Sequence, residues 1–263
     1  MNKLLHALHV AGIAVFIALG LLLISQGESS AELTTSADGG PVNIGFFYHG
    51  SSVSINGSSD RGADIIIKIT SEGGHHTLRQ KGKVGVLWMN VGTLKFAHVP
   101  SVYFLESTRK LDDILSAEEQ LRHSLGYTAL ARESEITPLK NAEEKENWFK
   151  EFLKYKEASM VYSVSSGNIS LTPKDGQQQF HVEMHWPYQA PPGEYLVTAY
   201  AVKNGKIVEK AEDKIVVQQV GVIKSLAGMA KNNGAFYGLI SVLVALGAGF
   251  GVGLIFRKGG GGH

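Results

Sequence analysis

The sequence predicts a mainly β protein: an immunoglobulin-like antiparallel β-sandwich with a helical insertion, followed by a C-terminal transmembrane helix. Two stretches of the chain contain short apolar or alternating segments with turn residues at regular spacing, as in a sandwich. Between them, apolar residues recur at helical spacing. Near the end, a long apolar run contains no charged residue. Two small β domains separated by a helical hairpin are the alternative arrangement.

The composition argues against several classes of function. The 263 residues carry a formal net charge of +1, so no basic excess points to nucleic acid. Cysteine is absent, which rules out disulfides, thiolate metal ligands and cysteine nucleophiles. No serine lies in a Gly-x-Ser-x-Gly motif, and the Gly-rich run belongs to the apolar C-terminal segment. We therefore expect no catalytic residue set and no cofactor.

Residues 1–31 have the three parts of a secretory signal. Lys3 precedes an apolar run over residues 10–24, and the small pair Ser29 and Ala31 follows it. We expect cleavage after Ala31, and an uncleaved N-terminal anchor is the alternative. Either form places the next part of the chain outside the cytoplasm.

Residues 32–41 are polar and predict a linker, and residues 42–109 predict the first half of the sandwich. Within this half, Ile65–Ile67 is typical of a strand covered on both faces. We expect strands over residues 84–89 and 94–105, separated by a turn at 90–93, with Pro100 marking an edge strand or a bend.

Residues 110–158 predict the helical insertion. Ser116 with Glu119 forms a capping box, and Asn141 with Glu144 opens a helix over about residues 142–157.

Residues 159–219 predict the second half of the sandwich. Its strand 180–186 alternates apolar and polar residues, and Asn204–Gly205 predicts a two-residue hairpin turn.

The C-terminal part of the chain predicts a membrane anchor. Residues 220–233 form an amphipathic lead-in, and residues 234–256 are long enough, at roughly 34 Å as a helix, to cross a bilayer. Arg257 and Lys258 begin the tail 257–263 and predict that it is cytoplasmic. The main domain is then expected on the opposite side of the membrane.

Glycines recur at alternate positions of the expected span: Gly247, Gly249, Gly251 and Gly253. Glycine lowers helix stability, but small residues four apart allow a second helix to approach closely. The pattern predicts a packing surface for an integral membrane partner or for a second copy of the chain.

Two groups of polar residues are candidate ligand sites. His181, Glu183 and His185 alternate on one strand, so they share a face and present donors suited to Zn²⁺ or Cu²⁺; a solvated strand face is the plainer interpretation. A second alternating group, Arg79, Lys81 and Lys83, predicts an anion-binding face, with edge-strand protection as its alternative.

Trp88-Met-Asn90, Pro100-Ser-Val-Tyr103 and Ser107-Thr-Arg109 follow one another along the chain. In this order they resemble the signature of a family of uncharacterised transmembrane proteins first grouped from alphaproteobacteria. The resemblance covers nearly the whole chain after residue 31 and is strongest in Trp-x-Asn, Pro-Ser-x-Tyr and Ser-Thr-Arg elements. Its signature positions here are Trp88, Asn90, Pro100, Tyr103 and Arg109. The chain departs from the family pattern at Gln80, where the family favours arginine, and at Lys110, where it favours proline.

The resemblance implies a bacterial inner-membrane protein with a periplasmic β domain and a single C-terminal span. It also implies a partner, because such proteins are often encoded beside permeases that resemble sulfite or organosulfonate exporters. We therefore expect a non-enzymatic accessory subunit of a membrane transport complex. The alternative is a periplasmic metal- or oxyanion-binding protein or a metal-dependent hydrolase.

Overall fold

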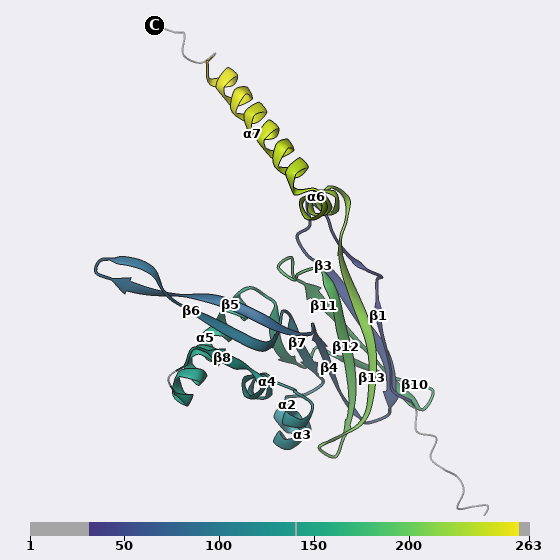
Figure 1. Ribbon diagram of the computed structural model, residues 1–263. Helices are drawn as coiled ribbons and strands as arrows, with labels where there is room; N and C mark the ends of the chain where they lie inside the picture. The colour runs from purple at the N-terminus through teal and green to yellow at the C-terminus, as the bar shows by residue number, and fades with distance from the viewer. Residues whose placement is uncertain (1–31, 140, 258–263) are drawn as a thin grey trace, which may run out of the picture. The chain divides into compact units, whose positions relative to one another are not determined.

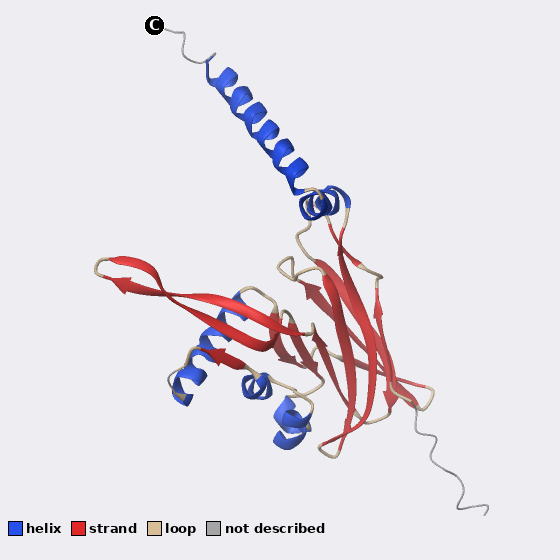
Figure 2. Cartoon of the chain, viewed as in Figure 1, coloured by secondary structure: helices blue, strands red, loops and turns tan. Residues whose placement is uncertain are grey.

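The computed structural model describes residues 32–139 and 141–257 (Figure 1). The expected signal segment 1–31 and the tail residues 258–263 lie outside the described residues. The described chain is mainly β, with three sheets, several helices and one C-terminal apolar helix, which confirms the predicted fold class at this level (Figure 2). The strands are β1 Thr34–Asp38, β2 Val42–Ile44, β3 Ser51–Asp60, β4 Asp64–Thr70, β5 Gly73–Val84, β6 Leu87–Pro100, β7 Tyr103–Ser107, β8 Glu135–Thr137, β9 Tyr162–Ser166, β10 Ser170–Lys174, β11 Gln177–Trp186, β12 Gly193–Lys203 and β13 Lys206–Gln219. The helices are α2 Leu111–Ile114, α3 Ala117–Arg122, α4 Tyr127–Glu133, α5 Ala142–Ala158, α6 Gly221–Asn232 and α7 Gly234–Arg257.

Two of the sheets share one apolar core. One has the strand order β1-β3-β11-β10 and the other β2-β13-β12-β4-β7-β9. Trp186, from β11 of the first sheet, is buried against Phe104 and Tyr195 of the second, with ring centroids 5.9 and 4.7 Å apart. Because alternate residues of a strand face opposite sides, each sheet contributes every second side chain to this layer.

The strand pairing differs from a purely antiparallel sandwich at several points. Strands β2 and β13 pair in parallel, and so do β7 and β9. Residues 32–41, expected to be a linker, contain β1, which pairs with β3. Local composition indicates β3 only weakly, because Val53 and Ile55 are its only large apolar residues. β1 and β3 are polar segments that form strands because they pair with strands elsewhere in the chain.

The third sheet has the order β5-β6-β8 and lies against the helical insertion. Phe96 of β6 stacks on Phe152 of α5, with ring centroids 4.6 Å apart, and both rings are buried. The predicted helix starts are confirmed: the side chain of Ser116 accepts from the amide of Glu119, and that of Asn141 accepts from the amide of Glu144. Residues 42–109, expected to form only sandwich strands, therefore also contain the β5–β6 hairpin of this third sheet.

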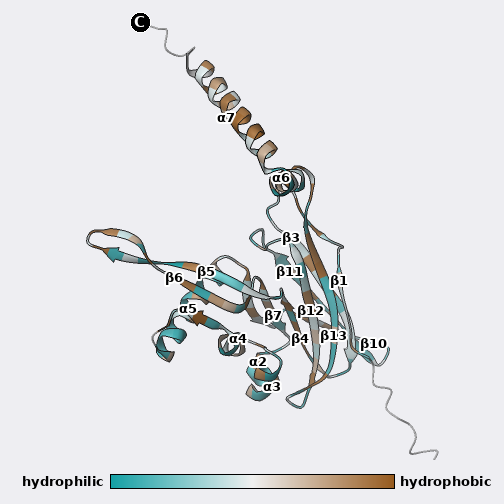
Figure 3. Ribbon diagram, in the orientation of Figure 1, coloured by the Kyte–Doolittle hydropathy of each residue, from teal (hydrophilic) through white to brown (hydrophobic). Residues whose placement is uncertain are grey.

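The junction with the anchor is defined by backbone contacts. Strand β13 ends where the amide of Val220 donates to the carbonyl of Ile44, at 3.0 Å. Helix α6 follows at once, and α7 begins at Gly234. The stretch Gly234–Leu254 is long and apolar enough to cross a membrane, and apolar residues recur along α7 (Figure 3). Its side chains are not covered by the rest of the described chain.

Candidate functional site

The β5–β6 hairpin carries both exposed cations and exposed apolar side chains. Its turn lies at Gly85 and Val86, since Val84 pairs with Leu87. Gly85 has a φ of 63°, as the first position of a II′ hairpin turn requires, and glycine adopts this conformation without strain. The turn expected at residues 90–93 is therefore wrong, and strand β6 runs on to Pro100.

The base of the hairpin is held by the core. Leu94 and Phe96 are buried beneath it, and β8 pairs with β6 over Lys95–Ala97. Along β5, half-buried residues alternate with exposed residues. The hairpin therefore has one face fixed on α5 and one face in solvent near its base.

The solvent face is basic. Arg79, Lys81 and Lys83 are all exposed and alternate along β5, as the sequence predicted, and Lys95 is exposed on β6. None of these four cations forms an ion pair within the described residues. Glu135 of β8 is an acidic residue near the base, where it pairs with Ala97.

The tip of the hairpin is apolar. Val86, Leu87 and Trp88 are 89%, 65% and 72% exposed, and Val84, Met89 and Val91 are exposed as well. Tertiary pairing brings two sequence-predicted groups together here: Trp88 lies opposite Lys83, and Asn90 lies opposite Lys81. The single strand expected over residues 84–89 is wrong, because Gly85 and Val86 form the turn. Nothing in the periodicity of this run separates an exposed strand from a buried one.

The other signature positions have structural partners. The carbonyl of Pro100 accepts a hydrogen bond from the hydroxyl of Tyr162, at 2.6 Å. The hydroxyl of Tyr103 accepts from the amide of Gly126, at 2.8 Å. Arg109 pairs with the carboxylate of Asp64 and holds the pKa of that carboxyl below its usual value. Pro100, Tyr103 and Arg109 thus each join two segments of the fold. Trp88 and Asn90, in contrast, are exposed to solvent.

The histidines of β11 share an exposed face, as their alternation predicted. Each side chain has a neighbour on β3 or before it: His181 Nδ1 lies 2.6 Å from Asn56 Oδ1, Glu183 accepts from Ser52, and the His185 ring lies against the backbone at Gly50. Within residues 32–139 and 141–257, no group of three His, Asp or Glu side chains is placed to hold a metal ion.

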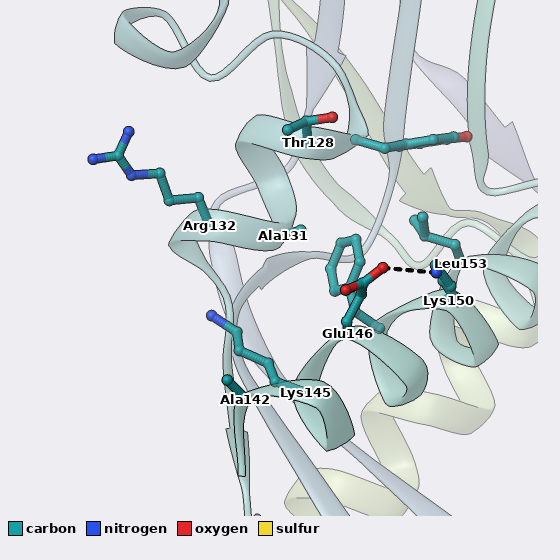
Figure 4. Close-up of a pocket in the computed structure, with 10 residues that line it drawn as sticks. Thr128, Ala131, Arg132, Ala142, Lys145, Glu146, Lys150 and Leu153 are labelled. Carbon is teal, nitrogen blue, oxygen red and sulfur yellow. Dashed lines mark ion pairs between the residues drawn. The ribbon is translucent and has the colours of Figure 1, made fainter.

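A shallow groove separates α4 from α5 (Figure 4). Tyr127, Phe149 and Leu153 contribute its apolar lining, and an ion pair of 2.7 Å joins Glu146 to Lys150. Both charged residues lie one turn apart on α5, so the pair is a local helix interaction.

Sequence reasoning missed a buried cation on α5. Lys156 of α5 is buried; its ammonium donates to the carbonyl of Ser101 at 3.3 Å and lies 5.2 Å from the ring centre of Tyr162. Burial lowers the pKa of Lys156 to about 8. In the sequence this lysine belongs to a helix of mixed charges, and its spacing from Phe149 and Phe152 was the signal that it shares their face.

The glycines of α7 lie on two sides of the helix. Gly249 and Gly253 form a groove together with Ala245, Leu246, Phe250 and Leu254. Residues two apart on a helix point about 200° apart, so Gly247 and Gly251 lie on a different side. A Cβ atom at any of the four would meet nothing within 4 Å in the described chain.

Apolar side chains also surround the start of the anchor. Phe46 and Phe47 are 70% and 81% exposed, and they follow Ile44, the residue bonded to Val220. Val222 and Leu226 of α6 are exposed too. Val222 and Leu226 lie on the apolar side of α6, and Lys224 and Lys231 lie on the opposite side. A helix that lies in a membrane interface has this arrangement.

Comparison with known proteins defines the family of this chain. No curated protein sequence matches it. A family model matches residues 32–258, which is most of the chain and includes the β domain, the hairpin, α6 and α7. The chain therefore belongs to the family described as "Putative transmembrane protein (Alph_Pro_TM)".

Proposed function

We propose that this protein is a non-enzymatic accessory subunit of a membrane complex, bound to an integral membrane partner through α7. The observation that carries the proposal is the groove at Gly249 and Gly253, which is open and unfilled on a helix of membrane-spanning length. Glycine is costly in a helix that only contacts lipid, whereas a partner helix gains close van der Waals packing from it.

The family resemblance supports a class of partner. We propose a permease related to sulfite or organosulfonate exporters, with the β domain in the periplasm and the C-terminus in the cytoplasm of a bacterial inner membrane. Arg257, next to the span, supports this orientation by the positive-inside rule. A periplasmic reporter fused after Gln218 is expected to be active and one fused after Lys258 inactive; the reverse pattern contradicts the orientation.

The partner contact is tested by purifying the full chain from membranes in mild detergent. The double variant Gly249→Leu, Gly253→Leu fills the groove, and the double variant Gly247→Leu, Gly251→Leu adds the same side chains on another side. We expect the first variant to lose the integral membrane proteins that accompany the wild type and the second to keep them. If both variants retain every association, the packing proposal fails.

Self-association through the same groove is distinguished in the same experiment. Two differently tagged copies of the chain are expressed together, and one tag is used for purification. Recovery of the second tag, lost only in the Gly249 and Gly253 variant, identifies a second copy as the partner.

A second candidate function is binding of a free oxyanion. The observation in its favour is the basic face of Arg79, Lys81 and Lys83, whose charges have no acidic partner among the described residues. Sulfite or sulfate bound there raises the melting temperature of the full chain, and the rise grows with the logarithm of ligand concentration above the dissociation constant. No rise, together with no metal in elemental analysis of the purified chain, contradicts both this candidate and a metal-dependent hydrolase.

A further inference from the structure

The β5–β6 hairpin ends in an apolar tip that no part of the described chain covers. We propose that this tip inserts into the interface of an anionic lipid bilayer, while the cations behind it bind lipid headgroups. The proposal goes beyond the accessory function above, because it needs no protein partner.

The tip has two different sides. Cross-strand partners share a side of a hairpin, and Val84 pairs with Leu87 while Gly82 pairs with Met89. This side is apolar throughout. The other side carries the pairs Lys83 with Trp88 and Lys81 with Asn90.

A bilayer interface matches this arrangement better than a groove on a protein. Apolar side chains project from both sides of the tip, and lipid can surround both, whereas a one-sided groove leaves Trp88 or Leu87 in water. The tip is also a two-residue turn with few flanking side chains, and a stable protein interface needs about 800 Å² from each partner.

The charges favour a negatively charged surface. Arg79, Lys81, Lys83 and Lys95 follow the tip along the exposed face without an ion pair in the described residues. Membrane–water interfaces favour tryptophan next to lysine. The indole ring lies at the boundary of the apolar region, and the ammonium reaches the headgroups. Anionic lipid is thus complementary to the hairpin in charge as well as in polarity.

The chain supplies the bilayer itself. Its family and its apolar helix α7 make it a membrane protein, so lipid is always present at high effective concentration near the domain. The insertion is expected to be shallow. A two-stranded hairpin leaves backbone N–H and C=O groups along its outer edges, and these groups need water or headgroup partners.

Because the chain contains no cysteine, a spin label reacts only with a cysteine that is introduced for the test. The full-length variant Leu87→Cys carries a nitroxide at the tip, and Lys206→Cys carries the same label at the exposed β12–β13 turn as a matched control. Each labelled chain is reconstituted in vesicles of phosphatidylcholine, with and without phosphatidylglycerol. Accessibility to oxygen, which concentrates in lipid, is compared with accessibility to a water-soluble nickel complex.

We expect the label at residue 87 to favour oxygen in the anionic vesicles and the label at residue 206 to favour the nickel complex. Adding Lys81→Gln and Lys83→Gln is expected to lower the ratio of inserted to free tips about thirtyfold, from roughly 1 kcal/mol per cation near an anionic surface. A label at residue 87 that stays fully accessible to nickel overturns the proposal. So does a label shielded from both reagents, which indicates a protein contact instead of lipid.

Discussion

Replacing Lys156 with methionine is expected to flatten the dependence of folding stability on pH. Burial lowers the pKa of Lys156 from 10.5 to about 8, because the folded state desolvates the ammonium group. Below pH 8 both the folded and the unfolded chain hold this proton, so the charge destabilises the fold by a constant amount. Between pH 8 and 10.5 the folded chain releases the proton while the unfolded chain keeps it. The free energy of unfolding of the wild type therefore rises with pH in this window.

The size of the effect follows from the displaced pKa. Each pKa unit corresponds to about 1.36 kcal/mol, which gives an upper bound of about 3 kcal/mol for the full displacement. Contact of the ammonium with the Tyr162 ring and residual solvent reduce this bound. We expect the wild type to gain roughly 1–2 kcal/mol between pH 7 and pH 9.5 that the Lys156→Met variant does not gain.

The assay is urea unfolding of the full chain in mild detergent, followed by tryptophan fluorescence across this pH range. The change with pH is compared instead of the stability at one pH, because the variant also loses the hydrogen bond to Ser101, worth about 1 kcal/mol. The control is Lys154→Met, since Lys154 is exposed and pairs with Glu151 at 2.6 Å. Equal pH dependence of wild type and Lys156→Met refutes the reasoning.

Three further substitutions test the packing of the described domain, each by urea unfolding of the full chain in mild detergent. Gly57→Ala is expected to destabilise the fold by about 2–4 kcal/mol, because its Cβ would overlap the ring of Phe180; near-wild-type stability would contradict this contact. Phe152→Ala removes a fully buried ring and is expected to cost about 3–5 kcal/mol, and a cost below about 1 kcal/mol would mean that the core refills the space. Asp64→Asn is expected to cost about 1 kcal/mol at neutral pH, because Arg109 lowers the pKa of Asp64 and that stability is lost as pH falls through the folded pKa; a difference that persists at acid pH would rule out the ion pair as its cause.

The candidate surfaces were predictable to different degrees. The basic alternation of Arg79, Lys81 and Lys83 was legible in the sequence, because neighbouring positions on one strand depend only on its period of two. The pairing of Lys83 with Trp88 and of Lys81 with Asn90 was not. It depends on a turn at Gly85–Val86, and the apolar run around that turn has the composition of a buried strand.

The buried face of α5 shows the same limit. The cap at Asn141 and the apolar spacing of Phe149 and Phe152 are local features, and they predicted the helix correctly. The burial of Lys156 on that face depends on the carbonyl of Ser101 and the ring of Tyr162, which other segments bring to it.

The sequence by itself determined the candidate membrane-spanning helix, its glycine spacing and the alternation of strand β11, because each depends on residues a few positions apart. Tertiary structure alone decided which strands pair and where the exposed apolar residues lie. β3 pairs with β11 over more than a hundred residues, and β7 pairs in parallel with β9 across the helical insertion. Such pairings depend on the packing of distant side chains, which local periodicity does not encode. The exposed tip of the β5–β6 hairpin is a consequence of that packing, since the core covers the hairpin's base and leaves its apolar end uncovered.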